Sequence, residues 1–358
     1  MPVNVTPGSA GYPRNHWYVA AFSHEVKTGE LLKRTLCDEP VVLYRLSDGS
    51  PVALFDRCPH RGLPLSMGRL LPNDRLQCLY HGFEFASSGQ CTLVPSQDVP
   101  PKAIRVRAYP VVEKWKWIWF WPGDPEKADP ALIPDHVASG LEAEGWVSVV
   151  GTMLPVQANY LLASENLADA THISYLHHGL IDDSKAAKYP FELIQEDGSV
   201  ALVREIRSER QGEVICKSFG WEQGIVLDRT LRLENRPPQT CIVANTWRAA
   251  EGGPAFAPFS NKLIVMLTPA SVRSTLQFVA LTFKGAAPPP VPREVQEAQL
   301  RYLLSEDVVA IEAIQKLIDD LPPEQSVEMS VRADEGGIRT RRLIAAMLER
   351  EQRASVSS

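Results

Sequence analysis

The chain has 358 residues, a length that predicts one large domain or two medium-sized domains with sizeable cores. Hydrophobic residues make up 44% and charged residues 22% of it, which excludes a disordered or fibrous chain. The 37 Lys and Arg residues against 43 Asp and Glu residues give a formal charge of −6, so no basic field would attract nucleic acid or a membrane surface. The first residues do not resemble a signal peptide and no apolar run would span a membrane, so we expect a soluble, cytoplasmic protein.

The first third of the chain predicts a small all-β unit. Between Trp17 and Trp121, short runs rich in β-forming residues alternate with turn residues. These runs are EPVVLYRLSDG, SPVALFDRC, RLQCLYHGFEF and VVEKWKWIWFWPG. Tryptophans recur with period two at the end of the last run, which predicts four indoles on one face of a strand: Trp115, Trp117, Trp119 and Trp121.

The remainder predicts a helix over about 159–176 and then a series of strands. The strands are expected near 199–207, 226–235, 240–249, 261–270 and 274–284. Because no helical pattern separates them, they favour an antiparallel sheet. The Pro-rich run 285–292 ends the sheet, and apolar spacing then predicts a long helix over 293–321 and a second helix near 337–351.

A change in composition divides the chain into two domains. The segment after Pro122 is rich in Pro, Asp and Gly, which indicates a linker. We therefore expect an all-β domain over 1–125, a linker over 126–145, a second domain over 146–350 and a disordered tail over 351–358. The predicted fold class is α+β, with an antiparallel sheet and a long C-terminal helix in the second domain.

The all-β region carries two Cys-His pairs, Cys58 with His60 and Cys78 with His81. Two thiolates and two imidazoles suit either a structural zinc ion or a 2Fe-2S cluster with two histidine ligands. A zinc site of the common type pairs Cys with Cys and His with His, whereas here each loop offers one of each. The sequences CPHRG and YHG, with a glycine after each second ligand, resemble the signature of a Rieske 2Fe-2S cluster.

A second group of acidic and histidine residues lies in NYLLASENLADATHISYLHHG. Glu165, Asp169 and His172 are spaced four and three residues apart, which would place them on one face of a helix. His177 follows five residues later, so both histidines reach one metal only if the helix bends or ends near Tyr175. Two histidines and one carboxylate are the facial ligands of non-haem Fe(II) oxygenases, and the alternative is a local helix without metal.

Together these motifs resemble the Rieske non-haem iron oxygenases. The pattern E-N-x2-D-x2-H-x4-H downstream of a Rieske motif is similar to the catalytic motif of that family. The segments YPRNHWYVAAFSHEV, CPHRGLPLSMG, WIWFWPGDPEKADPALIP and LLSEDVVAIEAIQ extend the resemblance over nearly the whole chain, towards the aromatic O-demethylase branch that includes the vanillate enzymes. The resemblance implies a Rieske domain followed by a helix-grip catalytic domain, with one 2Fe-2S cluster and one mononuclear Fe(II).

The resemblance also implies a third iron ligand on the long C-terminal helix. The family pattern E-D-x4-E maps this ligand to Asp307, with Glu306 and Glu312 as rivals. Asp307 shares a helix side with Ile311 and Ile314, and a charge beside apolar neighbours is better explained by a cation than by solvent.

In the family, the aspartate that matches Asp169 hydrogen-bonds an iron-binding histidine, here His172, and reaches a Rieske histidine, here His81, of a neighbouring subunit. The resemblance therefore implies that electrons cross a subunit interface and that the active form is a head-to-tail homotrimer. Asn159 and Glu165 are expected as neighbours of the catalytic site.

The implied activity is that of a monooxygenase. Electrons from NADH would pass through a separate flavin and 2Fe-2S reductase, and dioxygen would serve to hydroxylate the methyl carbon of a methoxylated aromatic acid such as vanillate. The resulting hemiacetal would collapse to a phenol and formaldehyde.

Substrate contacts are expected from the antiparallel sheet. In CIVANTWRA, Asn245 and Trp247 share one face of a strand while Arg248 lies on the other. Asn245 is a candidate hydrogen-bond donor to the substrate. Arg248 is either a partner for an aromatic carboxylate or an ordinary surface residue.

Two alternatives stay open at this stage. A Rieske electron carrier without catalysis would need only the first domain, and the second domain with its histidines argues against it. Ring hydroxylation or N-demethylation of another aromatic substrate would use the same cofactors and give a different product. The short chain favours the single-subunit monooxygenase branch over ring dioxygenases, which have longer catalytic subunits.

Overall fold

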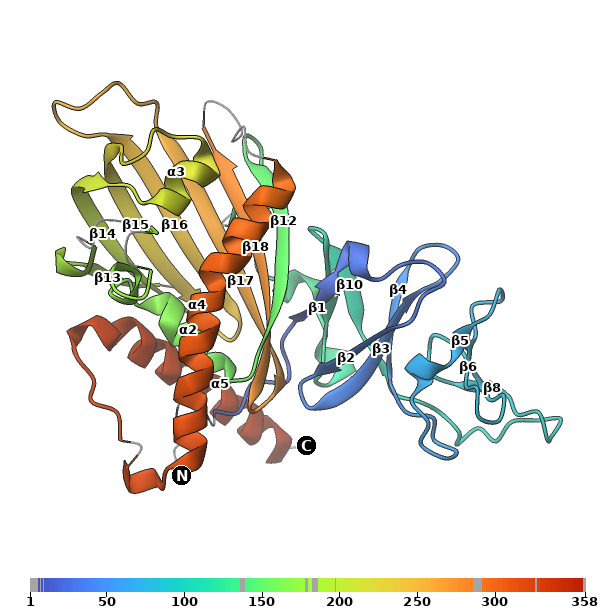
Figure 1. Cartoon of the computed structure of the whole chain (residues 1–358). Helices are drawn as coiled ribbons and strands as arrows, with labels where there is room; N and C mark the ends of the chain where they lie inside the picture. Colours follow the sequence, from blue (N-terminus) through green and yellow to red (C-terminus); the bar gives the residue numbers. More distant parts are fainter. Residues whose placement is uncertain are drawn as a thin grey trace. The chain divides into compact units, whose positions relative to one another are not determined.

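The computed structural model describes residues 6, 8, 10–135, 139–177, 180–181, 186–196, 198–285, 292–325 and 327–356. The chain divides into two compact units, and Figure 1 shows the elements of each. The N-terminal unit comprises Arg14–Pro134 and Thr268–Ser271, and the C-terminal unit comprises the rest. Within the described residues, this division differs from the expected domain bounds because residues 10–13 group with the C-terminal unit and residues 268–271 with the N-terminal one. Among the described helices, none has the length and apolarity that a membrane crossing requires.

The N-terminal unit is all-β, as predicted. Its first sheet has the order β1 (Tyr18–Phe22), β11 (Trp117–Phe120), β10 (Val111–Lys114). The second has the order β2 (Leu32–Leu36), β3 (Glu39–Arg45), β4 (Pro51–Phe55), β9 (Ala108–Tyr109). The third, made of short strands, has the order β5 (Arg69–Leu70), β6 (Leu76–Gln77), β7 (Glu84–Phe85), β8 (Cys91–Leu93), and the two Cys-His loops adjoin it.

The tryptophan run is a hairpin rather than one strand, so the prediction of four indoles on one face is wrong. Strands β10 and β11 pair antiparallel with Lys114 opposite Trp117. Trp115 and Lys116 form the connecting turn, with φ of 56° and 66°. Two left-handed residues give a turn that matches the twist of the strands, and the usual sign of such a turn, an Asn or Gly, is missing here. Trp117, Trp119 and Trp121 are nevertheless buried.

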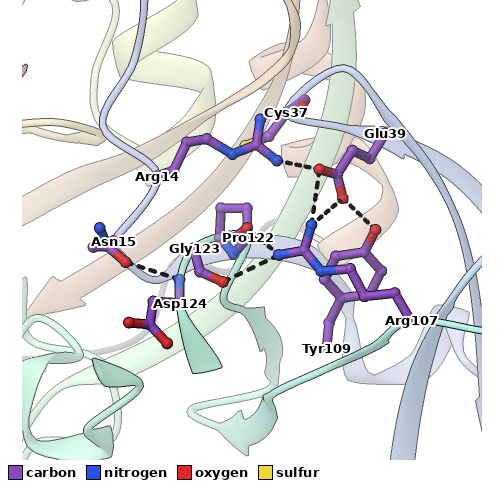
Figure 2. A network of polar contacts seen from close by, with 9 residues as sticks. All are labelled: Arg14, Asn15, Cys37, Glu39, Arg107, Tyr109, Pro122, Gly123 and Asp124. Carbon is purple, nitrogen blue, oxygen red and sulfur yellow. Dashed lines mark hydrogen bonds and ion pairs between the residues drawn. The ribbon is translucent and has the colours of Figure 1, made fainter. Parts of the chain in front are cut away.

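A polar network fastens the start of the N-terminal unit to its sheets (Figure 2). The Glu39 carboxylate at the start of β3 accepts hydrogen bonds from Arg14, from Tyr109 and, at 3.0 Å, from Arg107. Arg107 also donates to the carbonyl oxygens of Pro122 at 2.6 Å and Gly123 at 3.1 Å. Burial, reinforced by the Glu39 carboxylate, raises the pKa of Tyr109. The network therefore joins four segments of one unit through the half-buried Glu39 carboxylate and the Arg107 guanidinium.

The C-terminal unit is built on one seven-stranded antiparallel sheet. Its order is β12 (Val147–Val156), β18 (Ser274–Lys284), β17 (Phe259–Ser271), β16 (Thr240–Ala249), β15 (Val226–Arg236), β14 (Ser199–Arg210), β13 (Glu192–Glu196). All five predicted strands are present, and the two edge strands, β12 and β13, are additional. Figure 1 shows α3 (Glu213–Phe219) and the long α4 (Arg293–Asp320) over one face of this sheet. Residues 286–291, expected to end the sheet, lie outside the described residues.

The helix α2 (Tyr160–Ala168) is shorter than predicted. Asn159 caps its start by accepting the Leu161 amide at 3.0 Å. It ends before Asp169, whose backbone is extended with φ −110° and ψ 120°. The Asp169 carboxylate accepts the backbone N–H of Thr171 at 2.8 Å, a local turn that competes with helix continuation. The predicted common helical face of Asp169 and His172 is therefore wrong.

Helix α5 (Glu335–Val356) is longer than predicted and packs against α2. It includes residues 351–356, so the expected disordered tail is wrong over that segment, while residues 357–358 lie outside the described residues. The last turns, LEREQRA, consist largely of good helix formers, which explains the extension.

Candidate active site

Two histidines and one carboxylate converge in the C-terminal unit. The ligand-type atoms of His172, His177 and Asp307 all lie within 4.8 Å of one another. Asp307 Oδ1 lies 3.2 Å from His177 Nε2 and 3.5 Å from His172 Nε2. His177 is 2% and Asp307 6% exposed, so the charge of the carboxylate lies in a nearly dry environment. Such a group fits a metal cation, which would satisfy all three side chains at once.

The turn segment after α2 and the helix α4 bring these side chains together. His172 opens a short 3-10 turn, His172–Ser174, just after the turn made by Asp169, and His177 follows five residues later. Asp307 comes from the middle of α4. The two rings lie 5.5 Å apart and nearly perpendicular, an arrangement that a continuous helix would not give. The early end of α2 thus allows both histidines to face one point.

Neighbouring side chains hold two of these groups in place. Glu306 Oε2 lies 2.7 Å from His177 Nδ1, so the carboxylate orients the ring and leaves Nε2 for a metal. Asn166 donates from Nδ2 to Asp307 Oδ1 at 3.2 Å. Glu312, the other rival of Asp307, instead accepts the backbone N–H of Gln157 at 2.7 Å. The geometry therefore favours Asp307 as the third ligand.

The two histidines differ electrostatically. Burial lowers the pKa of His172, and the nearby Asp307 carboxylate only partly opposes this. Burial also disfavours the charged form of His177, but the hydrogen bonds and charges of Asp307 and Glu306 outweigh it and raise the pKa of that ring. A metal would bind the neutral form of either ring, with the Glu306 contact fixing the tautomer of His177.

Asp169 lies beside this group, and the described hydrogen bonds of its carboxylate go to Thr171 and not to a ligand atom. Its carboxylate accepts the backbone N–H and the hydroxyl of Thr171. Its negative charge favours the protonated ring of His172 and so, like that of Asp307, partly opposes the lowering of the His172 pKa by burial. The hydrogen bond between the Asp169 carboxylate and His172 that the family resemblance implies stays a prediction.

The two Cys-His loops of the N-terminal unit are built alike. Cys58 N–H donates to the Leu63 carbonyl oxygen at 2.8 Å, and Cys78 N–H donates to that of Phe83 at 2.9 Å. The amides of Gly62 and Gly82 donate to the carbonyl oxygens of Cys58 and Cys78, each at 2.9 Å. Both glycines have left-handed backbones, with φ of 79° and 74°, so the glycine after each ligand pair is a conformational requirement.

The four loop side chains fit a two-iron cluster better than a single ion. The His60 and His81 rings lie 4.5 Å apart and are exposed, while Cys58 and Cys78 are buried. The two thiols hydrogen-bond each other, so the loops present one buried sulfur pair and one exposed imidazole pair, which matches one iron held by two cysteines and the other by two histidines. Burial raises the pKa of Cys58 to about 11. A bound metal would lower this pKa again, because it stabilises the thiolate.

A largely apolar cavity adjoins the His172, His177 and Asp307 group, and we call it the substrate cavity. Its polar lining, besides those three and Asp169, consists of Ser218, Arg229, Asn245, Asn261, Gln296 and Gln299. The apolar lining comes from α2, α3, α4, the turn after α2 and the sheet: Leu167, Ile173, Ile181, Val214, Ile215, Phe219, Leu231, Leu233, Val243, Leu263, Leu281, Leu300, Leu303 and Leu304. A flat apolar ring with a few polar substituents suits such a lining.

A buried polar chain forms one wall of the substrate cavity. Arg229 is 2% exposed and pairs at 2.7 Å with Glu209, which is fully buried. Arg229 also donates to Asn245 Oδ1 at 3.4 Å, and Asn245 Nδ2 donates to Asn261 Oδ1 at 3.0 Å. The pairing of β16 with β17 sets Asn245 directly opposite Asn261, so both point into the cavity.

The sequence-predicted substrate residues divide into two groups. Asn245 lines the substrate cavity, as its assignment requires. Trp247 shares its face but is fully buried behind the described lining, where its indole donates to Gln211 at 2.9 Å. Arg248 is exposed on the other face of the sheet and donates to the Thr230 hydroxyl at 3.4 Å. Among the residues that the sequence analysis missed is Arg229, and its position on the same strand face as Leu227 and Leu231 in LDRTL was a usable signal.

Comparison with known proteins gives the family. A model of the Rieske [2Fe-2S] domain matches residues 16–110, and a model of the vanillate O-demethylase oxygenase C-terminal domain matches residues 156–350. The dicamba O-demethylase oxygenase component of Stenotrophomonas maltophilia is 34% identical over 308 residues, which are 85% of this chain and 88% of that protein. The chain belongs to the Rieske non-haem iron oxygenases. It is therefore an oxidoreductase whose cofactors are a Rieske 2Fe-2S cluster and a mononuclear iron.

Two further relatives of this oxygenase support the same family. The vanillate O-demethylase oxygenase subunit of Pseudomonas sp. (strain HR199 / DSM 7063) is 29% identical over 351 residues, 96% of this chain and 97% of that protein. A crystal structure of dicamba monooxygenase with non-haem iron and dicamba superposes with a TM-score of 0.80 at 31% identity, covering 96% of this chain and all of that one. The fold is thus shared over 96% of the chain.

Proposed function

We propose that this oxygenase O-demethylates a methoxylated aromatic acid such as vanillate, releasing formaldehyde. The observation that carries the proposal is the substrate cavity itself, in which an apolar lining ends at His172, His177 and Asp307 and one wall presents buried amides. The relatives named for vanillate and dicamba O-demethylation support the same reaction class.

Two sets of residues would hold the two cofactors. His172, His177 and Asp307 would hold the iron, and Cys58, His60, Cys78 and His81 would hold the cluster. When bound, these groups supply electron transfer and the oxygen activation that hydroxylates an unactivated methyl carbon.

The side chains of the cavity act on the substrate and on water. The leucines and isoleucines sandwich the aromatic ring and exclude water, so that the methyl group rather than solvent meets the oxidant. Asn245 and Asn261 offer amide groups to polar ring substituents and thereby fix which substituent points towards the histidines. After hydroxylation the hemiacetal carbon–oxygen bond breaks to give a phenol and formaldehyde.

Electron delivery requires partners. We propose a separate NADH-dependent reductase carrying a flavin and a 2Fe-2S centre, and a head-to-tail homotrimer in which Asp169 meets His81 of a neighbouring chain. The exposed rings of His60 and His81 support an exchange of electrons at the loop surface. The position of Asp169 beside His172, with its charge acting on that ring, supports its place at the end of the route.

Formaldehyde release tests the proposal. The iron-replete protein is combined with NADH and a vanillate-type reductase, and oxygen uptake and formaldehyde are measured with a panel of methoxybenzoates and N-methyl aromatics. We expect formaldehyde in step with oxygen from vanillate or a close analogue. Oxygen uptake without formaldehyde from any methoxybenzoate would contradict O-demethylation and point to hydroxylation of another position.

A further inference from the structure

A second cavity, which we call the polar cavity, shares Asp169 with the substrate cavity. Its lining comes from the end of α2, the segment before α5 and the first turns of α5: Glu165, Ala168, Asp169, Glu328, Met329, Ser330, Ala333, Asp334, Gly337 and Arg341. It thus contains four carboxyl groups and one guanidinium. Polar walls of this kind suit water, and the cavity reaches Asp169, the side chain that it shares with the substrate cavity.

Two carboxylates of the polar cavity, Glu165 and Glu328, pair with Arg341, and Glu165 is the less exposed of the two. Its side chain is 18% exposed and forms a two-point ion pair with Arg341, with Arg341 Nη2 at 2.6 Å from Oε2. Arg341 Nη2 also donates to Glu328 at 2.9 Å. Gly337 lets α5 approach, because a Cβ there would lie 3.0 Å from Glu165 Cγ. The carboxyl group is therefore held in one position facing the polar cavity.

The proposed reaction consumes protons as well as electrons. If the protein is an O-demethylase, as proposed above, an aryl methyl ether, dioxygen, two electrons from the reductase and two protons give a phenol, formaldehyde and water. The carbon–hydrogen bond of the methyl group and the oxygen–oxygen bond break, one oxygen atom enters the methyl carbon, and the other leaves as water. The two protons must come from solvent to a site whose described lining is mainly apolar.

The substrate cavity offers few groups that could pass these protons. Its titratable lining residues are Asp169, His172, His177, Arg229 and Asp307. Three of them are the candidate iron ligands, and Arg229 is paired with the buried Glu209. Outside the lining, Glu306 reaches the group only through the His177 ring. Among the titratable residues of the described lining, Asp169 is thus the one that is neither a candidate iron ligand nor held in a buried ion pair.

We propose that the polar cavity is the proton entrance of the catalytic site and that Glu165 is the residue that carries protons through it to the boundary at Asp169. Glu165 and Asp169 lie four residues apart and line the same cavity, so water can bridge them. Arg341 positions the Glu165 carboxylate, and the partly exposed Glu328 marks the solvent side. Burial, against the opposing charge of Arg341 and with like charges from Glu328 and Asp334, raises the pKa of Glu165, which suits a group that binds and releases protons.

The test compares Glu165→Gln with Glu165→Asp and a matched control. Glu234→Gln removes another mostly buried carboxylate that pairs with two arginines, Arg232 and Arg236, but lines neither cavity. Each variant is first checked for iron content and for the cluster spectrum. The chemically reduced holoenzyme is then mixed with dioxygen and vanillate in H2O and in D2O, and cluster re-oxidation and products are measured in a single turnover.

We expect re-oxidation in Glu165→Gln to be slower by about tenfold or more, because a neutral amide carries no proton. The Glu165→Asp variant should fall between that and the wild type, the control should match the wild type, and D2O should slow the wild type. Equal rates for Glu165→Gln and the wild type in both solvents would overturn the proposal, as would an equal slowing in Glu234→Gln. Formaldehyde reports separately on the proposed function, since dioxygen reduced to hydrogen peroxide also takes up two protons and still shows the proton effect.

Discussion

The two metal-binding regions of this oxygenase hold their ligands in opposite ways. The cluster ligands sit on two short loops with the same hydrogen-bond pattern, and both histidine rings are exposed. The iron ligands come from a turn and a helix separated by 130 positions in the chain, and His177 and Asp307 are buried. Exposed rings suit a centre that only exchanges electrons at a surface, whereas burial suits a centre that must exclude water from a reactive oxidant.

The difference also affects how each region tolerates change. The loops rely on backbone geometry, with glycines at left-handed positions and backbone hydrogen bonds to the cysteines. The iron group relies on side-chain neighbours such as Glu306, Asn166 and Asp169. Mutations of neighbouring side chains should therefore disturb the iron selectively, while backbone changes should disturb the cluster.

The largest expected effect follows from removing an iron ligand. His177→Ala should abolish turnover and lower the iron content by one atom per chain, because the remaining imidazole and carboxylate leave an incomplete facial site. The visible spectrum of the cluster should be unchanged, since the two regions share no ligand. Iron analysis and absorption spectra check this, with His24→Ala as an exposed control. Loss of the cluster together with the iron would contradict the independence of the two regions.

The next effect concerns the residue at the end of the electron route. Asp169→Asn should retain iron and cluster but reduce turnover by about 100-fold, because the charge that acts on His172 is lost while the turn with Thr171 can persist. Asp228→Asn is the control, since Asp228 likewise accepts a backbone amide, that of Ser208, on the sheet surface. Single-turnover electron transfer measures the effect. Normal turnover in a metal-replete Asp169→Asn protein would remove Asp169 from the route.

The contrast between the regions also explains what the sequence could predict. The cluster ligands lie within two short motifs, so the predicted ligands Cys58, His60, Cys78 and His81 could be named from their resemblance to the Rieske signature. The left-handed backbones of Gly62 and Gly82 give the physical reason for the glycine in each motif. The inner strands and α4 could also be predicted, because the spacing of apolar residues within each segment shows which side of a strand or helix is buried. These features depend on near neighbours in the chain.

The missed features depend on distant neighbours or on local competition. The end of α2 is decided by one carboxylate that bonds Thr171, against an otherwise helical pattern. The wall of the substrate cavity joins Glu209, Arg229 and Asn261 from three strands, and only their pairing in the sheet reveals it. The Trp115 turn carries none of the residues that usually mark a hairpin.

A smaller effect should follow from changing Glu306, the carboxylate of α4 that contacts His177. Glu306→Gln keeps an acceptor for His177 Nδ1 but loses the negative charge, and we expect iron to bind about tenfold more weakly. Titration of the iron-depleted protein with Fe(II) measures this. Glu312→Gln on the same helix is the matched control, because Glu312 bonds the Gln157 amide and should leave iron affinity unchanged. Equal weakening in both variants would mean that helix charge, and not the contact with His177, is responsible.

The smallest expected effect distinguishes the two cluster loops from each other. Alanine at Gly62 or Gly82 must adopt a left-handed backbone, at a cost of about 1–2 kcal/mol. A Cβ at Gly62 would lie 3.4 Å from the flexible Arg57 side chain, whereas one at Gly82 would lie 2.9 Å from the rigid ring of Pro95. Gly82→Ala should therefore lower the melting temperature and the cluster content more than Gly62→Ala, while iron content in the C-terminal unit stays normal. Equal losses in the two variants would show that backbone strain alone matters, and a loss of mononuclear iron would show that the loops and the iron group are coupled after all.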